Sequence, residues 1–187
     1  NGKSGVFIEE LPTSDDIITS TATISGNTIV RNSGASYGGG ISVGTGSPPQ
    51  PQNLTMHITN NYIADNLGGG IYASNTQIVN VRYNRIHNNT ATDGSALYIS
   101  ENEGSSGLDT YEYNTITGGT GTSLIYKYQG NPTIRNNNFV HKSETYLIYD
   151  DRGVEETATF DFENNWWGTT DTTNLDALIY DWNDNAT

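Results

Sequence analysis

Four tyrosines recur at a position that suits contact with sugars. Each follows an apolar residue, in the pairs Ile71-Tyr72, Leu97-Tyr98, Ile125-Tyr126 and Ile148-Tyr149. If the apolar residues point inward, the tyrosines point outward, because side chains alternate along a strand. On strands about 4.8 Å apart the rings would then form a continuous aromatic strip. Sugars offer apolar C–H faces and hydroxyl groups, so the strip is a candidate glycan-binding site. The alternative is that the stacked rings only stabilise the sheet.

Acidic residues supply the candidate catalytic and metal-binding groups. Asp150-Asp151-Arg152 is the foremost catalytic candidate, although vicinal aspartates in a turn are usually solvated turn residues. Ca²⁺ prefers oxygen ligands, and Asp65, Asp93 and Asp109 are expected in turns where carboxylates of neighbouring repeats could converge. Without cysteine or a His-x-x-x-His spacing, the sequence predicts no transition-metal site, and it indicates no cofactor beyond Ca²⁺.

Basic residues are candidates for the proton-abstracting base of a lyase. Arg82 and Arg135 each stand two residues before a recurring asparagine, but Glu112 holds the same position between them. An outward Arg-Glu-Arg column reads more simply as charge pairing between neighbouring strands. The sequence therefore favours pairing over catalysis at these arginines.

Composition excludes several classes of partner. The formal net charge is −13, from 8 basic and 21 acidic residues. This field repels nucleic acid and anionic membranes, because phosphate binding needs clustered Lys and Arg. No apolar run approaches the length of a membrane span. Only 33% of residues are hydrophobic, but they come in short, regularly placed groups that predict many short strands joined by polar turns.

One motif, apolar-x-x-Asn-x-apolar, recurs six times along the chain. Its asparagines are Asn27, Asn61, Asn84, Asn114, Asn137 and Asn165, with steps of 34, 23, 30, 23 and 28 residues. Such a period is typical of a solenoid, in which the apolar residues of each coil stack on those of the next. We expect each asparagine to bend the chain in a left-handed conformation while its amide bonds its counterpart in the next coil, forming a ladder.

The repeats resemble a known family. Asn61-Tyr62-Ile63-Ala64-Asp65-Asn66 and Gly68-Gly69-Gly70-Ile71-Tyr72 are similar to the parallel β-helix repeats of the pectin-lyase-like superfamily, over roughly residues 20–168. The stretch Asn164-Asn165-Trp166-Trp167-Gly168 resembles the terminal motif of bacterial and archaeal surface proteins with right-handed β-helix regions. The resemblance implies an all-β, right-handed parallel β-helix of about six to seven coils, secreted or held at the cell surface.

The same resemblance bears on catalysis. Pectin-degrading β-helices of the hydrolase type carry an adjacent Asp pair, as at Asp150-Asp151, together with Gly-His-Gly and Arg-x-Lys signatures that this sequence lacks. Lyases of this fold use a cation, often Ca²⁺, to neutralise the uronate carboxylate. The missing signatures incline the prediction away from an enzyme.

The ends of the chain are expected to differ from its middle. We predict one domain, a fragment of a larger protein, with an incomplete first coil at 1–20, repeat coils at 21–168 and a C-terminal cap at 169–187. In the cap, Leu175, Leu178, Ile179 and Trp182 have helical spacing. The open end of a β-solenoid is an exposed sheet edge that must be covered.

Three functions remain open. The preferred one is a non-catalytic extracellular β-helix module that binds polysaccharide or mediates adhesion at the cell surface. The alternatives are a polysaccharide lyase or glycoside hydrolase acting on acidic glycans, and a structural spacer or self-assembling surface element. The expected partners are accordingly a glycan or further copies of the chain, with no nucleic acid and no membrane insertion.

Overall fold

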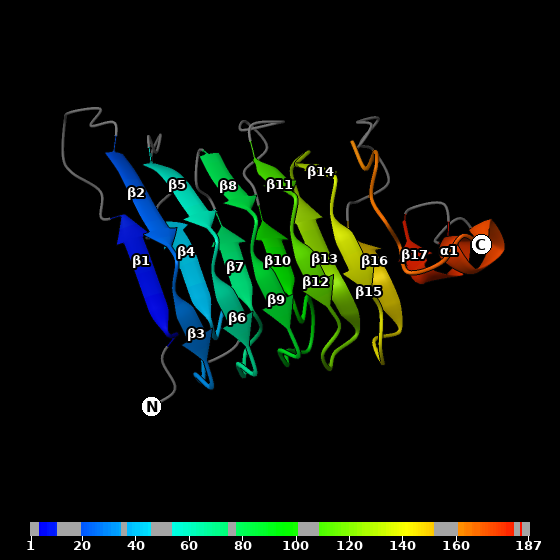
Figure 1. Ribbon diagram of the computed structural model, residues 1–187, viewed down its shortest axis with the longest axis horizontal. Coiled ribbons are helices and arrows are strands. Elements are labelled where there is room, and N and C mark those ends of the chain that lie inside the picture. Colours follow the sequence, from blue (N-terminus) through cyan, green and yellow to red (C-terminus); the bar gives the residue numbers. More distant parts are fainter. Residues whose placement is uncertain are drawn as a thin grey trace.

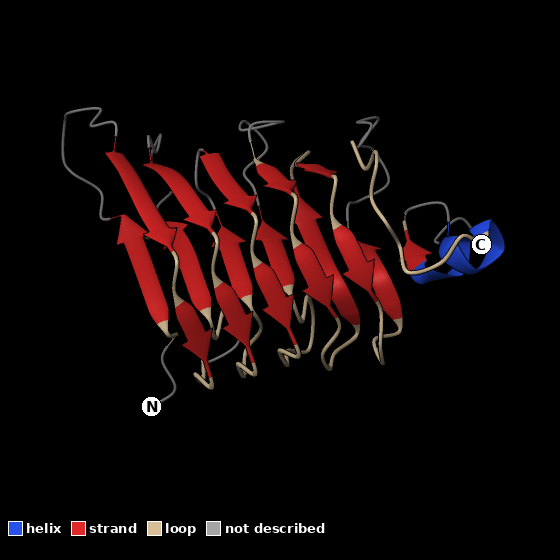
Figure 2. Ribbon diagram, in the orientation of Figure 1, coloured by secondary structure: helices blue, strands red, loops and turns tan. Residues whose placement is uncertain are grey.

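The chain winds through three parallel sheets (Figures 1 and 2). The computed structural model describes residues 4–10, 20–34, 37–45, 54–74, 78–100, 109–151, 161–181 and 184. Sheet A contains, in spatial order, β1 (Val6–Glu10), β4 (Ile41–Thr45), β7 (Ile71–Ser74), β10 (Leu97–Ser100), β13 (Ser123–Gln129), β16 (Tyr146–Asp150) and β17 (Ile179–Tyr180). Sheet B contains β2 (Ser20–Ser25), β5 (Leu54–Thr59), β8 (Ile78–Arg82), β11 (Thr110–Glu112) and β14 (Thr133–Arg135). Sheet C contains β3 (Thr28–Val30), β6 (Tyr62–Ala64), β9 (Arg85–His87), β12 (Thr115–Thr117) and β15 (Asn138–Val140).

Each coil runs from sheet B through sheet C to sheet A, and the described chain holds five such coils, from β2–β4 to β14–β16. β1 precedes them, while residues 161–180 follow them. Every strand pairs with the equivalent strand one coil away, in parallel register. The predicted all-β parallel solenoid is therefore confirmed, since a chain that returns to each sheet once per coil is a β-helix.

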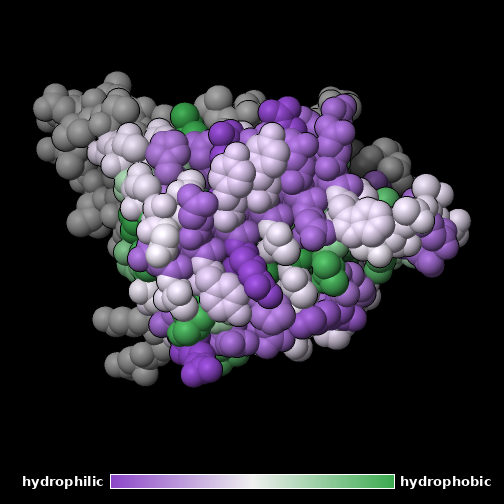
Figure 3. All heavy atoms as spheres, in the orientation of Figure 1, coloured by the Kyte–Doolittle hydropathy of each residue, from purple (hydrophilic) through white to green (hydrophobic). Residues whose placement is uncertain are grey.

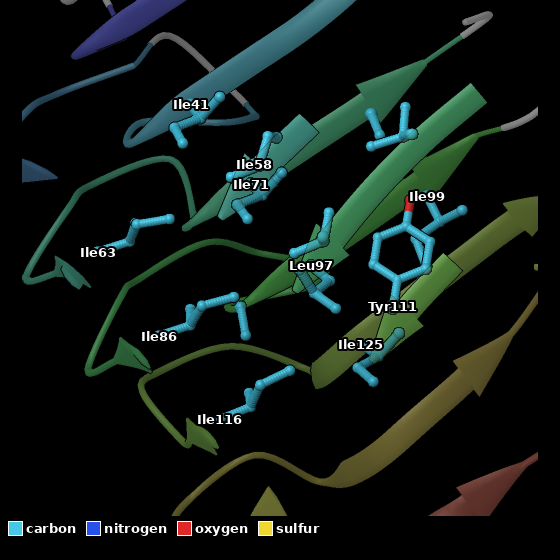
Figure 4. Close-up of a cluster of buried hydrophobic side chains, with 14 of the residues drawn as sticks. Ile41, Ile58, Ile63, Ile71, Ile86, Leu97, Ile99, Tyr111, Ile116 and Ile125 are labelled. Atoms are coloured by element: carbon cyan, nitrogen blue, oxygen red, sulfur yellow. The ribbon is translucent and has the colours of Figure 1, made fainter. Parts of the chain in front are cut away.

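The apolar residues of the motif form the core. The strand pairing stacks them in three inward columns, which converge in Figure 4. The column on sheet B runs Ile24, Ile58, Val81, Tyr111, Ile134; that on sheet C runs Ile29, Ile63, Ile86, Ile116, Phe139; that on sheet A runs Ile41, Ile71, Leu97, Ile125, Ile148. Apart from the first coil's Ile24 and Ile29, these side chains are at most 1% exposed. Burying one such side chain contributes about 1.5–3 kcal/mol, so stacking like on like supplies the main stabilising term.

The predicted asparagine ladder is present at every step from Asn27 to Asn165. In a typical rung, the backbone N–H and the Nδ2 of Asn61 donate to Oδ1 of Asn84, at 2.9 and 3.1 Å. The same Nδ2 donates to the carbonyl oxygen of Ile24, one coil back, at 2.9 Å. Each asparagine thereby satisfies buried groups of two neighbouring coils, which explains why this residue type recurs.

The prediction that the ladder asparagine is itself left-handed was wrong. The residue before it has positive φ, and these residues are Gly26, Asn60, Tyr83, Tyr113, Asn136 and Asn164. Their side chains are exposed or half-exposed, so residue types as different as glycine and tyrosine serve there. The bend is made by this preceding residue, which leaves the following asparagine free to point its amide into the stack.

A second corner of the same design lies between sheets C and A. Arg31, Asp65 and Asn88 have positive φ and precede Asn32, Asn66 and Asn89, which form a second ladder. In the fourth coil this ladder gives way to Gly119, whose N–H donates to the Glu144 carboxylate. Burial raises the pKa of Glu144, but hydrogen bonds from the backbone and from Ser95 outweigh it and leave the pKa lowered.

The C-terminal segment closes the stack. Asn165 ends the first ladder, while the ring of Trp167 stacks on Phe139 at the end of the sheet C column, with centroids 5.0 Å apart. The α-helix α1 (Thr172–Leu178) follows, capped by the side chain of Asp171, and lies at this end of the molecule (Figure 1). With seven residues it is too short to cross a membrane, and the described part of the chain has no helix that could.

The extent of the predicted helix needs correction. The helical spacing of Leu175, Leu178, Ile179 and Trp182 predicted one helical stretch, but the helix ends at Leu178. Ile179 and Tyr180 instead form β17, which pairs with β16 at the edge of sheet A; Trp182 lies outside the described residues. Leu178 and Ile179 pack against the core. Pairing with a free sheet edge satisfies backbone groups that a longer helix would have left open.

Candidate functional site

The outward face of sheet A carries the aromatic strip in the register that the sequence predicted. Strand pairing places Tyr72, Tyr98, Tyr126 and Tyr149 opposite one another in one row. Consecutive ring centroids are 5.2, 4.8 and 5.5 Å apart. The apolar residue before each tyrosine is buried in the core, which fixes the rings on the outside.

Two further tyrosines join this row, Tyr180 at its end and Tyr37 at its side. Tyr180 of β17 stacks on Tyr149 at 4.4 Å, and Tyr37 lies 5.5 Å from Tyr72 and 4.3 Å from Tyr98. We call Tyr37, Tyr72, Tyr98, Tyr126, Tyr149 and Tyr180 the tyrosine strip. Tyr180 follows the apolar Ile179, as the four tyrosines of the repeat follow theirs, but the predicted helix hid this signal. Tyr37 comes from the turn before β4 and had no signal in the repeat.

The rings of the strip cover one another's faces. Four neighbouring pairs have interplanar angles of 7° to 28°. Sugars therefore cannot lie flat on the inner rings, and what the strip presents to solvent is ring edges and hydroxyl groups. Burial raises the pKa of Tyr98, with Tyr37 and Tyr72 adding to the effect. The hydroxyl of Tyr98 accordingly stays protonated at neutral pH and can donate a hydrogen bond.

Asp150 and Asp151 point to opposite sides of sheet A. Asp150 belongs to β16 and not to a turn; it is 5% exposed, and its Oδ1 lies 3.1 Å from Nζ of Lys127, which is fully buried. Asp151 lies at the surface, where it accepts a hydrogen bond from the hydroxyl of Tyr126. That bond, after burial, raises the pKa of Tyr126. Arg152 lies outside the described residues. The two carboxylates thus form no common surface pair.

The three calcium candidates are dispersed. Asp65 stands at a corner and accepts a hydrogen bond from Asn88, while Asp109 is buried and accepts the N–H of Val79 at 2.6 Å. Asp93 lies between sheets C and A, beside the tyrosine strip. Among the described residues, no three His, Asp or Glu side chains come together in a way that could hold a metal ion.

The arginine candidates are engaged in the predicted charge column on sheet B. Nη2 of Arg82 lies 2.9 Å from Glu112, and Nε of Arg135 lies 2.5 Å from the same carboxylate. Glu112 is 3% exposed beneath them, and it raises the pKa of Arg135. Both guanidinium groups are engaged in ion pairs with Glu112, and a guanidinium offers hydrogen-bond donors but no acceptor for a proton.

Comparison with known proteins fixes the family. A family model described as right handed beta helix region matches residues 23–139, which is more than half of the chain. The chain belongs to this family. The match ends at Phe139, so the terminal Asn165-Trp166-Trp167 copy of this right-handed β-helix protein lies beyond it. A search of curated proteins and a search of solved structures each gave no match.

Proposed function

We propose that this right-handed β-helix protein is a non-catalytic extracellular module that binds polysaccharide along the tyrosine strip. The observation that carries the proposal is the row of stacked tyrosines on sheet A, whose hydroxyl edges follow one another from coil to coil. Because the strip crosses successive strands, it runs along the helix axis. A repeating ligand lying along that axis would meet the same group at every coil, about 4.8 Å apart.

The chemistry of the strip favours an extended, uncharged glycan. Such a polymer offers hydroxyl groups at a repeat close to the coil spacing, and each tyrosine hydroxyl both donates and accepts hydrogen bonds. Asp151 and Asp93 flank the strip, and the net charge is −13. Polyuronates would be repelled by this field. Polysaccharides of this kind surround cells, and so the proposal places the module outside the cell or on its surface.

The face of the molecule seen in Figure 3 is compatible with contact to a hydroxyl-rich polymer. The face seen in Figure 3 is predominantly hydrophilic, with only small separate hydrophobic areas. A self-assembling surface element would instead be expected to carry a larger apolar patch. Binding by many weak, repeated hydrogen bonds is the mode that fits a polymer, since neighbouring contacts along one chain reinforce one another.

Affinity electrophoresis in gels containing neutral polysaccharides tests the proposal. We expect the polysaccharide to retard the protein. The affinity derived from this retardation should be at least tenfold lower for a Tyr72→Phe, Tyr98→Phe, Tyr126→Phe variant. Phenylalanine keeps the stacking and removes only the hydroxyl; each lost hydrogen bond is worth about 0.5–1.5 kcal/mol, and about 1.4 kcal/mol is tenfold in affinity.

A matched control comes from a second tyrosine pair. Tyr83 and Tyr113 also stack, at 5.3 Å and 10°, but they lie at the corner between sheets B and C. A Tyr83→Phe, Tyr113→Phe variant should bind as the parent does. Equal retardation of all three proteins would overturn the role of the strip. If no neutral polysaccharide retards the protein and the protein self-associates, the alternative of a structural spacer or self-assembling surface element would be favoured.

A further inference from the structure

A hollow of about 470 Å³ opens beside the tyrosine strip, between sheets C and A. It is lined by Gly34, Tyr37, Leu67, Gly68, Thr90, Ala91, Thr92 and Asp93. The volume falls in the range of about 300–1,000 Å³ that small-molecule sites occupy. Tyr37 belongs both to the lining and to the strip, so the hollow continues the strip at this point.

Backbone hydrogen bonds between neighbouring coils form the floor of the hollow. Gly34 N–H donates to the Leu67 carbonyl oxygen, and Gly68 N–H donates to the Thr90 carbonyl oxygen, both at 2.7 Å. Gly68 has a φ of +98°, and a Cβ there would lie 3.1 Å from the Gly34 carbonyl oxygen. Glycine therefore lets the backbones of two neighbouring coils approach closely at the floor of the hollow, where hydrogen bonds join them.

The lining combines an apolar wall with an unengaged carboxylate. The apolar part of the lining comes from Leu67, which is 55% exposed, and Ala91. Asp93 is half-buried, and no hydrogen-bond donor to its carboxylate is found in the described ranges. Its charge raises the pKa of both Tyr98 and Tyr126, after burial and nearer neighbours. A half-buried acceptor that faces open space is suited to a ligand with hydroxyl donors.

We infer that this hollow is a subsite for one uncharged sugar residue at the end of the polysaccharide, with the Asp93 carboxylate accepting hydrogen bonds from two neighbouring hydroxyls. Leu67 and Ala91 contact the C–H face of the sugar, and the hydroxyls of Thr90 and Thr92 complete the polar contacts. The inference rests on the proposed function in taking the strip as the path of the rest of the polymer. A uronate residue would bring its carboxylate against Asp93 and is excluded.

Methyl NMR on the intact chain tests the subsite directly. The probes are methyl β-D-glucopyranoside, methyl β-D-galactopyranoside and their β-1,4-linked hexasaccharides, with galacturonic acid trimer as the anionic comparison. We expect a neutral glycoside to shift the Leu67 methyl signals saturably and the trimer to leave them in place. Asp93→Asn should weaken the binding at least tenfold. Asp65→Asn removes the same charge from a corner outside the hollow and should not change it.

The outcomes separate the subsite from the strip. If hexasaccharide shifts the aromatic NMR signals of the strip tyrosines while the Leu67 methyl signals stay unchanged, the subsite is refuted and the proposed function stands. If a monosaccharide glycoside moves the Leu67 methyls but no hexasaccharide touches the strip, the subsite stands and the proposed function fails. Equal binding by the parent and Asp93→Asn would overturn the role given to the carboxylate.

Discussion

Replacing Asn84 by alanine removes one rung from the middle of the first ladder. Asn84 is 2% exposed. Its Oδ1 accepts from the N–H and Nδ2 of Asn61, at 2.9 and 3.1 Å, and its Nδ2 donates to the Ile58 carbonyl oxygen at 2.7 Å. In the variant the Asn61 N–H and the Ile58 carbonyl oxygen lose this partner in a place that water does not reach, whereas Asn61 Nδ2 keeps its bond to the Ile24 carbonyl oxygen. A buried polar group left unsatisfied costs about 1–3 kcal/mol.

The expected loss of stability is therefore about 2–6 kcal/mol, a large part of the roughly 5–15 kcal/mol that a domain possesses. Asn27→Ala is the matched control, because Asn27 is exposed at the first rung and Oδ1 of Asn61 keeps the Asn27 backbone N–H as a donor. We expect it to cost less than about 1 kcal/mol. Urea unfolding followed by far-UV circular dichroism measures both variants. Equal destabilisation by the two substitutions, or a loss under about 1 kcal/mol for Asn84→Ala, would refute the account of the ladder.

Three further predictions concern the interior. Lys127→Met should cost about 3–5 kcal/mol because it leaves Asp150 buried without its ion-pair partner, whereas Lys127→Met with Asp150→Leu should recover most of that loss in urea unfolding. Gly39→Ala should abolish stable folding, because a Cβ there would lie 2.1 Å from a backbone carbonyl oxygen of the next coil, while Gly44→Ala, whose nearest atom is at 3.9 Å, should unfold at the parent's temperature. The folded protein lowers the pKa of Glu144, so ionised Glu144 stabilises the fold above its unfolded pKa of about 4.3, and this stabilisation is lost as the pH falls through its folded pKa. Glu144→Gln should therefore flatten the decline of melting temperature between about pH 5 and about pH 3.

The period and the inward columns were predictable from the sequence. In a β-helix, residues of one type stack on the same type one coil later, and the motif flanking Asn61 or Asn84 therefore gives the register of whole sheets. The same logic placed Tyr98 and Tyr126 in one outward row. The ladder followed because asparagine carries both a donor and an acceptor on a short side chain.

Features without a repeating pattern were not predictable. The buried pair of Lys127 and Asp150 occupies one inward position of sheet A in two successive coils. The coil before them carries Ile99 at that position, so the repeat does not predict charged residues there. Tyr37 joins the strip from a turn, where nothing in the sequence fixes direction. At the C-terminus, the spacing of Leu175 and Leu178 indicated a helix, but the free edge of sheet A captured the next two residues.

The second ladder was open to prediction and was missed. Asn32, Asn66 and Asn89 each stand five residues after an asparagine of the first ladder. The spacing is regular over three coils and ends at Gly119, which stands at the equivalent position of the fourth coil. There the Glu144 carboxylate of the next coil accepts the Gly119 N–H. A pattern that covers three of the five coils is easily attributed to the abundance of asparagine in the chain.

A crystal structure of the protein with a bound neutral hexasaccharide tests the central claim most directly. The account predicts a glycan lying along sheet A, parallel to the helix axis, with its hydroxyls within hydrogen-bond distance of the Tyr72, Tyr98 and Tyr126 hydroxyls. A glycan bound against the Arg82 and Glu112 column of sheet B, with the strip bare, would contradict it.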